Sequence, residues 1–313
     1  MLVATNVISK RKHCGIFDYS KRLVDKIEGA RVVDLRTSLK HGVEIGVVNY
    51  SNFLYSKNLI SHLLFVFFLL KKCKKFETLV LHESAEFNKR AWSWPVNILI
   101  LIQICILLKR CDRWIHAAEP PLSVYLKLNK NYVFCPVPSN FEGIWETIPE
   151  YTPSSLAKNI LIFGGGNGLV DGIDLSGVLG AHFFLMGGRR AGEFNLSKEY
   201  TELSDLAPQE VVKILIQTDV LFMPYVDGVN FKRGVFSAAL ELGIKVITTK
   251  GKFTKEGLVG DDMSLVFVPL EILKSREGVA RLLTKNATKT RCLVNRGVYV
   301  NRCSMRNLLS ILN

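Results

Sequence analysis

One segment, Thr218–Gly251, restricts the possible folds more than any other part of the sequence. It opens with a short apolar run, Val220–Met223, that stops at Pro224. A run of this kind, ending at a residue that cannot extend a hydrogen-bonded ladder, predicts a buried parallel strand. A helix follows, which Gly243 is placed to close, and a second strand is predicted at Lys245–Thr248. Strand, helix and strand in this order make a βαβ unit.

The loop between this strand and this helix predicts an anion-binding site. Lys232 and Arg233 supply two cationic donors, and Gly234 lets a ligand approach the unpaired N–H groups at the helix start. A phosphate or diphosphate is the ligand that suits such a place. A second interpretation stays open, in which the glycine serves helix–strand packing beside two solvated basic residues.

The rest of the chain repeats this alternation, so we expect an α/β fold. The predicted strands are Leu2–Ile8, Ala30–Leu35, Val43–Tyr50, Glu77–Leu81, Asp112–His116, Asn131–Val137, Asn159–Phe163, His182–Met186, Val220–Met223, Lys245–Thr248 and Ser264–Val268. The predicted helices include Leu59–Leu70, Val96–Leu108, Pro120–Leu128, Pro208–Gln217, Glu271–Leu283 and Arg302–Leu312. Prolines and serines between Ser139 and Ala157 indicate a connector, and the 313 residues suit two domains of ordinary size.

Charge and cysteine usage narrow the partners and the compartment. The net charge is +13, and the larger share of the excess lies in the first half of the chain. Because no nucleic-acid motif is present, we expect an anionic membrane surface as partner and no nucleic acid. The cysteine count, seven, is odd, and no CxxC pair occurs, which favours reduced thiols in the cytoplasm. The N-terminus reads as a first strand, with no secretory signal.

Two strongly apolar helices support the membrane prediction. Leu59–Leu70 is followed at once by the lysine-rich segment Lys71–Lys75, and Val96–Leu108 is followed by Lys109 and Arg110. Neither reaches the about 18–20 apolar residues that a membrane-spanning helix needs. They are either core helices of a Rossmann-like domain or a face that rests in the membrane interface with its lysines on anionic headgroups. Both interpretations can hold together.

Two further features point to ligand sites. His82 follows a predicted strand, and ligands of open α/β sheets bind at the carboxyl ends of strands. A purely structural histidine explains the same residue. The cluster Gly164–Gly168 does not match the GxGxxG fingerprint with its downstream acid, so an NAD-dependent enzyme is a weak alternative. The same glycines also fit a turn that faces a ligand.

Six stretches, in order along the chain, carry a resemblance to a known family. They are Cys14–Tyr19, Leu81–Glu83, Pro136–Asn140, Asp219–Tyr225, Asp227–Val229 and Lys232–Gly234. Together they resemble the GT-B glycosyltransferases, and look most like a bacterial subset of the retaining family 4. The resemblance implies two Rossmann-like domains facing across a cleft, with a C-terminal helix that packs back on the first domain. It also implies an N-terminal acceptor-binding domain (1–145), a donor-binding domain (146–300) and the returning helix (301–313).

The resemblance also implies roles for individual residues. His82 and Asp18 are the implied catalytic residues, with His82 at the donor sugar or the acceptor and Asp18 orienting the acceptor hydroxyl. The implied donor-binding residues are Gly15, Gly165, Arg189, Asp227, Asn230, Lys232, Arg233, Gly234 and Val235. The co-substrate would be a UDP-, GDP- or dTDP-sugar with no metal, and the acceptor a lipid-linked or envelope polysaccharide at the cytosolic membrane face.

One departure from the family pattern concerns two carboxylates. Many members carry two glutamates eight positions apart that contact the donor sugar and the ribose. The corresponding residues here are Asn230 and Ala238, and Glu241 lies three positions late. The exchange keeps open an alternative class, a non-catalytic GT-B-like binding or scaffold subunit.

Overall fold

The computed structural model describes most of the chain. The described residues are 1–5, 15–51, 59–82, 94–116, 123–136, 138–139, 141, 158–164, 169–187, 194–196, 200–204, 206–229, 234–251, 265–287, 297, 299, 301 and 304–312, without the side chains of 15–18. They divide into two compact units. Unit 1 comprises Met1–Val137 and Leu308–Asn313, and unit 2 comprises Pro138–Asn307. The domain boundary predicted after residue 145 lies outside the described residues.

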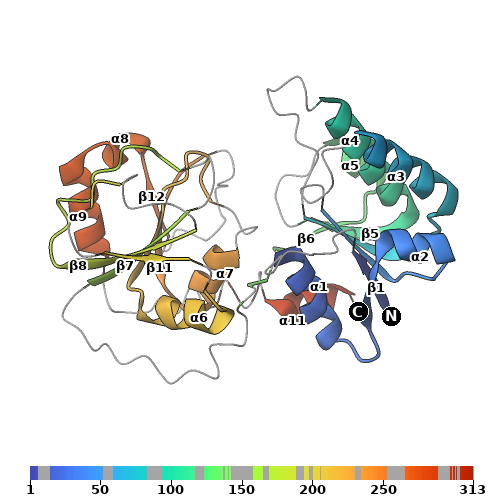
Figure 1. Cartoon of the computed structure of the whole chain (residues 1–313), viewed down its shortest axis with the longest axis horizontal. Helices are drawn as coiled ribbons and strands as arrows, with labels where there is room; N and C mark the ends of the chain where they lie inside the picture. Colours follow the sequence, from blue (N-terminus) through green and yellow to red (C-terminus); the bar gives the residue numbers. More distant parts are fainter. Residues whose placement is uncertain are drawn as a thin grey trace. The chain divides into compact units, whose positions relative to one another are not determined.

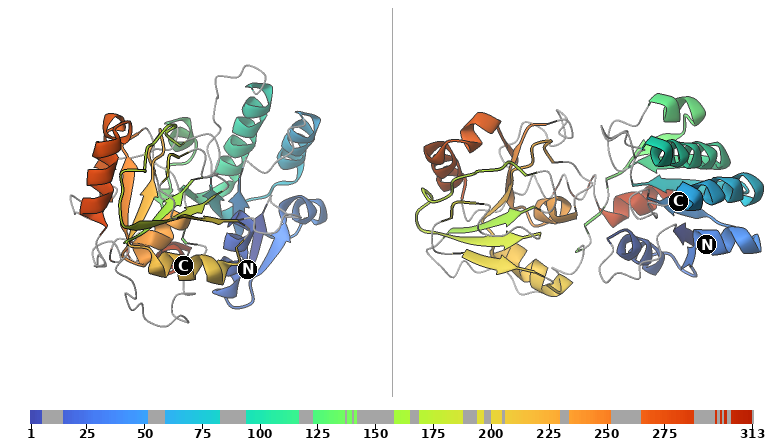
Figure 2. Two further views of the ribbon diagram at one scale, coloured as in Figure 1. Left: turned by 60° about the vertical axis from the view of Figure 1, so that its left-hand side comes forward. Right: turned by 45° about the horizontal axis from the view of Figure 1, so that its top comes forward.

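Unit 1 is a six-stranded parallel sheet covered by helices on both faces (Figure 1). Its strands are β1 (Leu2–Thr5), β2 (Arg31–Asp34), β3 (Val47–Tyr50), β4 (Phe76–Leu81), β5 (Cys111–His116) and β6 (Tyr132–Phe134), in the order β2-β1-β3-β4-β5-β6. Its helices are α1 (Gly15–Asp25), α2 (Leu35–His41), α3 (Leu59–Lys72), α4 (Trp94–Arg110), α5 (Ser123–Leu128) and most of α11 (Met305–Leu312). Figures 1 and 2 show α2, α3, α4 and α5 side by side on one face, with α1 and α11 on the other.

The helices of unit 1 are held by apolar and polar contacts. The core between the sheet and α2–α5 contains fully buried Phe65, Ile104 and Trp114. Within it the Tyr50 hydroxyl donates to Gln103 Oε1 at 2.6 Å, and the same glutamine amide lies 3.2 Å from the carbonyl of His62. This network ties α3 and α4 to β3, because a buried polar group must keep its hydrogen bonds. The resemblance predicted that the last helix packs on the first domain, and a hydrogen bond from Arg113 to the Leu312 carbonyl confirms it.

Unit 2 is a second six-stranded parallel sheet. Its strands are β7 (Lys158–Phe163), β8 (Ala181–Met186), β9 (Tyr200–Leu203), β10 (Val220–Met223), β11 (Lys245–Thr249) and β12 (Leu265–Val268), in the order β12-β11-β10-β7-β8-β9. Its helices are α6 (Pro208–Gln217), α7 (Gly234–Glu241), α8 (Leu270–Leu273) and α9 (Arg276–Asn286). Figures 1 and 2 show α6 and α7 on one side of the sheet and α8 and α9 on the other. The buried β10 and the αL residue Gly243, with φ 68°, confirm the βαβ prediction.

Several helices and strands differ from the prediction, each for a local reason. Helix α2 was not predicted, although Asp34 caps it and Gly42 ends it in the αL conformation. Strand β9 was also missed, because its largely exposed residues show no apolar pattern. The single helix predicted over Glu271–Leu283 is two helices, since Ser275 caps a new one. In the described part of the chain, every helix falls short of the length and apolarity that crossing a membrane requires.

Candidate functional site

Each sheet has one topological switch point, and both candidate sites lie there. In unit 1 the chain leaves β1 toward β2 and then returns to β3 on the other side of β1. In unit 2 the corresponding pair is β7 and β10, which are neighbours in the sheet. Ligands of open α/β sheets bind outside the carboxyl ends of strands at such points, where adjacent loops diverge. The topology therefore selects the loops after β1, β3, β7 and β10.

The carboxyl end of the first sheet carries a buried chain of polar side chains. The His82 ring donates from Nε2 to Asn49 Oδ1, and the Asn49 amide donates to Ser20 Oγ at 2.5 Å. Ser20 comes from α1, Asn49 from β3, and His82 from the end of β4. Each of the three side chains is nine-tenths buried or more. The chain therefore fixes the histidine against both the strand and the helix at the switch point.

This hydrogen bond also sets the protonation pattern of His82. Because Nε2 carries the hydrogen that Asn49 accepts, the basic lone pair of the neutral ring belongs to Nδ1. The Tyr19 ring packs edge-on against the imidazole, with ring centroids 5.0 Å apart and planes at 87°. Burial, with a smaller contribution from the charge of Cys135, raises the pKa of Tyr19 well above its ordinary value. Tyr19 is therefore a neutral phenol.

At the carboxyl end of the second sheet, main-chain segments approach one another closely at glycines, and the buried Thr248 and Thr249 hydroxyls donate to the Met223 and Tyr225 carbonyls. A Cβ on Gly251, after β11, would lie 2.2 Å from the carbonyl carbon of Asp227 in the loop after β10. A Cβ on Gly187, after β8, would lie 2.8 Å from the main chain of Gly164, after β7. Val170 N–H donates to the Pro224 carbonyl at 2.8 Å and joins the segments that follow β7 and β10. The switch point of unit 2 therefore depends on close backbone approach.

The structure tests the placement of some predicted site residues. His82 lies at the carboxyl end of β4 as predicted, and it is 3% exposed. Gly15 is the first residue of α1, Asp18 lies in the same helix, and Gly234 is the first residue of α7. Asp227 is half-buried in the loop after β10, and Val235 is buried in the first turn of α7. The predicted residues outside the described part are Gly165, Arg189, Asn230, Lys232 and Arg233.

Sequence reasoning missed Ser20 and Asn49. Asn49 is the second-last residue of the predicted strand Val43–Tyr50, flanked by Val48 and Tyr50. A lone amide inside a buried strand is costly unless it is hydrogen-bonded, so this residue was the available signal for a polar site. Ala238, at the position of one of the two family glutamates, is buried in α7.

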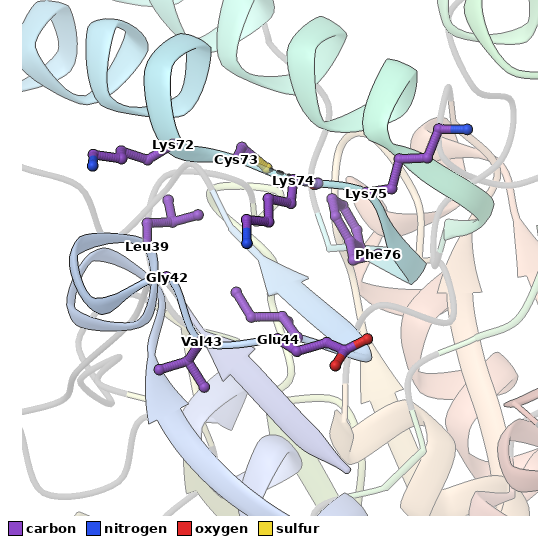
Figure 3. A pocket seen from close by; sticks show the side chains of 10 residues that line it. Leu39, Gly42, Val43, Glu44, Lys72, Cys73, Lys74, Lys75 and Phe76 are labelled. Carbon is purple, nitrogen blue, oxygen red and sulfur yellow. Dashed lines mark hydrogen bonds between the residues drawn. The ribbon is translucent and has the colours of Figure 1, made fainter.

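A cavity of about 350 Å³ lies at the opposite, amino end of the first sheet. It is bounded by the end of α2, the loop before β3 and the segment that joins α3 to β4. Figure 3 shows Lys74 pointing into the space beside Gly42 and Glu44, whereas Lys72 and Lys75 point away from it. Because the strands run away from this cavity toward the switch point, it is separate from the candidate site.

The described residues form neither a metal-binding cluster nor a disulfide. No group of three or more His, Cys, Asp or Glu side chains among them is arranged to hold a metal ion. The described cysteines Cys73, Cys105, Cys111 and Cys135 are free thiols. Burial raises the pKa of Cys73 to about 11 and that of Cys111 to about 12. These two thiols stay protonated near neutral pH.

Comparison with known proteins identifies the fold. No family model and no curated protein sequence matches the chain. Sucrose-phosphate synthase from Thermosynechococcus elongatus matches 99% of this chain and 96% of its own at 12% identity and a TM-score of 0.62. An alpha-glucosyltransferase in complex with UDP and a 13-mer DNA containing an HMU base matches 99% and 98% at 8% identity and a TM-score of 0.55. A protein from Listeria monocytogenes assigned as a UDP-N-acetylglucosamine 2-epimerase matches 99% and 95% at 8% identity and a TM-score of 0.51.

These structures agree with the chain over almost its whole length and in both parallel sheets. At such low identity the agreement concerns the architecture. The chain therefore has the GT-B fold, composed of two Rossmann-like α/β units.

Proposed function

We propose that the protein is a glycosyltransferase that moves a sugar from a nucleotide-sugar donor to a lipid-linked or envelope polysaccharide acceptor at the cytosolic membrane face. The donor is a UDP-, GDP- or dTDP-sugar, and the reaction is retaining and needs no metal, as in family 4. The observation that carries the proposal is the contrast between two switch points, one with a buried chain of polar side chains and one shaped by close backbone approach at glycines. Two GT-B neighbours, a sucrose-phosphate synthase and an alpha-glucosyltransferase with bound UDP, support it.

The donor half of the proposal rests on unit 2. Departure of a nucleoside diphosphate requires positive charge and N–H donors where negative charge develops. The main chain of Gly228 and Gly234 flanks the stretch that contains Lys232 and Arg233. Because Gly251 allows the loop after β10 to lie against the end of β11, this stretch starts from a fixed backbone position. The two cations and the first N–H groups of α7 hold the diphosphate.

The acceptor half rests on unit 1. Asn49 holds the His82 ring in a single tautomer, and the histidine positions the acceptor and the donor sugar at the end of β4. Asp18, two residues before Ser20 on α1, orients the acceptor hydroxyl. Gly15, the first residue of the same helix, is a donor-binding residue by the resemblance to family 4. The exposed apolar side of α3 favours an acceptor held in a membrane, because a soluble acceptor gives that surface no role.

The alternative is a binding or scaffold subunit that holds a nucleotide sugar without transferring the sugar. The exchange of the two family glutamates for Asn230 and Ala238 favours it. Calorimetry with UDP, GDP and dTDP tests the donor site, and the double variant Lys232→Ala with Arg233→Ala is expected to abolish binding. Release of nucleoside diphosphate from each donor sugar, with and without membrane-extracted lipid acceptors, then separates a transferase from a scaffold. Binding without release in every combination would leave only the scaffold.

A further inference from the structure

Helix α3 is apolar on its outer side as well as on its core side. The core side is formed by His62, Phe65, Val66 and Leu69, which are all buried. The outer side repeats the same helical spacing with large apolar residues: Ile60 (65% exposed), Leu63 (57%), Leu64 (62%), Phe67 (61%) and Leu70 (58%). A helix that is apolar all round is normally buried on all sides. In the described part of the chain this outer side is exposed, so α3 presents an apolar surface to a partner.

The neighbouring helix extends this surface. Helices α3 and α4 lie side by side on one face of unit 1 (Figures 1 and 2). On α4, Trp94 is 53% exposed, Ile98 45% and Ile102 38%. We call these three residues, with Leu59, Ile60, Leu63, Leu64, Phe67 and Leu70, the α3–α4 apolar surface. Its size and continuity distinguish it from isolated exposed apolar residues, which are common on soluble proteins.

The described border of the surface is mostly basic, although the Asp34 carboxylate caps α2. Helices α2, α3 and α4 contain no Asp or Glu. The last turns of α3 and α4 carry Lys71, Lys72, Lys109 and Arg110, and the Lys71 ammonium lies 5.9 Å from the centre of the Phe67 ring. A second copy of the chain would bring an equally positive border against this one, so self-association is disfavoured electrostatically. An anionic partner is favoured instead.

A groove between α2 and α3 combines both kinds of chemistry. It has a volume of about 280 Å³ and is lined by Arg36, Thr37 and Lys40 from α2 and by Leu64, Phe65 and Phe68 from α3. The Arg36 guanidinium lies 5.2 Å from the centre of the Phe65 ring. Cations on one wall and apolar side chains on the other suit a phosphate attached to a hydrocarbon chain.

We infer that the α3–α4 apolar surface docks in the headgroup region of a bilayer that contains anionic phospholipids, with a lipid phosphate between Arg36 and Lys40. The exposed residues run along the whole of α3, so this helix lies parallel to the bilayer plane with its apolar side in the interface. Helix α3 begins at the carboxyl end of the sheet, where His82 lies, and ends at Lys72 at the amino end. This inference deepens the membrane part of the proposed function and names the surface responsible.

Sedimentation of the full chain with vesicles tests the docking surface, and it uses neither a donor nor an acceptor. The wild type is expected to bind phosphatidylglycerol–phosphatidylcholine vesicles much more tightly than pure phosphatidylcholine vesicles. Leu63→Gln with Phe67→Gln is expected to weaken binding at least about tenfold, because each change removes an apolar side chain from the interface. Both residues are exposed, so the thermal unfolding midpoint is expected to stay unchanged. The matched control is Leu179→Gln, an 81% exposed apolar residue of unit 2, which is expected to bind like the wild type.

The charged border is tested in the same assay. Lys71→Gln with Lys72→Gln is expected to lower binding about fivefold per lysine, which corresponds to about 1 kcal/mol per cation near an anionic surface. Lys213→Gln with Lys285→Gln on α6 and α9 removes the same charge elsewhere and is expected to have little effect.

Three results would overturn the inference: absence of vesicle binding, equal losses in the test and control variants, or a wild-type dimer that Leu63→Gln with Phe67→Gln converts to monomers. Failure of the transferase proposal would leave vesicle binding intact. Conversely, sugar transfer to a short water-soluble acceptor by a protein that ignores vesicles would remove the docking surface alone.

Discussion

The two sheets of this protein share a topology but finish their carboxyl ends with opposite materials. In unit 1 the switch point holds a buried chain of side chains, Ser20, Asn49 and His82. In unit 2 the same position is shaped by Gly187 and Gly251, where a single Cβ would meet main chain. Side chains give direction and proton chemistry, whereas bare main chain gives close approach and N–H donors. The difference suits an acceptor site in unit 1 and a diphosphate site in unit 2, as proposed.

The largest effect is expected from a methyl group on the glycine edge. Gly251→Ala would place Cβ 2.2 Å from the Asp227 carbonyl carbon and 2.6 Å from the Gly228 nitrogen, both of which are main chain. We expect a loss of about 3 kcal/mol in the free energy of unfolding, at the upper end for overpacking. Urea unfolding followed by circular dichroism measures it.

The control for this prediction is Gly180→Ala. Gly180 has φ 66° and open space around its Cα, so the variant carries conformational strain alone and is expected to cost about 1 kcal/mol. Equal costs for the two variants would show that the close approach at Gly251 contributes nothing, and the contrast between the two sheets would fail.

The next effect is expected from the polar chain of unit 1. Asn49→Leu keeps the buried volume similar but leaves His82 and Ser20 without the hydrogen bonds that Asn49 makes. We expect the free energy of unfolding to fall by about 2 kcal/mol, because buried polar groups lose these hydrogen bonds. A double-mutant cycle with His82→Leu measures the coupling, and it is expected to recover part of the loss.

Asn159→Leu is the matched control for the asparagine. Asn159 donates from its side chain to the Gln217 carbonyl at 2.9 Å at an exposed position, so water replaces the lost bond and the expected cost is small. If the losses in the free energy of unfolding from Asn49→Leu and His82→Leu add strictly, the two residues are not coupled, which would contradict the hydrogen-bonded polar chain at the switch point.

The two edges also differ in how much of them the sequence predicts. Hydrophobic patterning predicts the strands of both units apart from the largely exposed β9, because a parallel strand buried on both faces, such as Val220–Met223, is a continuous apolar run. It also predicts His82 at a strand end. It does not predict that Asn49 bonds to both Ser20 and His82, since these residues are 29 and 33 positions away from Asn49 in the chain.

The glycine edge was less predictable. Gly251 reads in the sequence as an ordinary turn residue, and its close approach to Asp227 depends on the register of β10 and β11. The outer side of α3 was the subject of two predictions, a core helix and a membrane face. The structure confirms the core contacts through Phe65 and Leu69, and exposed Phe67 leaves the membrane face as a proposal.

Alkaline pH is expected to lower the stability of unit 1 more than that of unit 2. Burial raises the pKa of Cys73 to about 11 and of Cys111 to about 12, and both thiols belong to unit 1. Above pH about 9 the unfolded chain loses these protons while the folded chain keeps them, so stability falls as pH rises. Between pH about 8 and about 9.5 we expect the free energy of unfolding to fall by about 1.5 kcal/mol. Denaturant unfolding monitored by the fluorescence of the buried Trp114 measures this loss.

Cys73→Ala with Cys111→Ala removes both groups and is expected to flatten this pH dependence, whatever its effect on the absolute stability. A slope that persists unchanged in the double variant would contradict the assignment of the alkaline loss to Cys73 and Cys111.

The smallest effect is expected where the two units use the same chemistry. Asp34 caps α2 in unit 1 by accepting from the Thr37 N–H at 2.8 Å, and Ser275 caps α9 in unit 2 by accepting from the Gly278 N–H at 3.1 Å. Asp34→Ala and Ser275→Ala are each expected to cost about 1 kcal/mol, with Asp34→Asn and Ser275→Thr as conservative controls. Hydrogen exchange of peptides that cover each first turn measures the two losses locally. Because a cap satisfies the same orphan N–H groups in either unit, similar losses would confine the difference between the units to their carboxyl edges. A loss at Asp34 several times larger than at Ser275 would instead extend the difference to α2, which lines the groove beside α3.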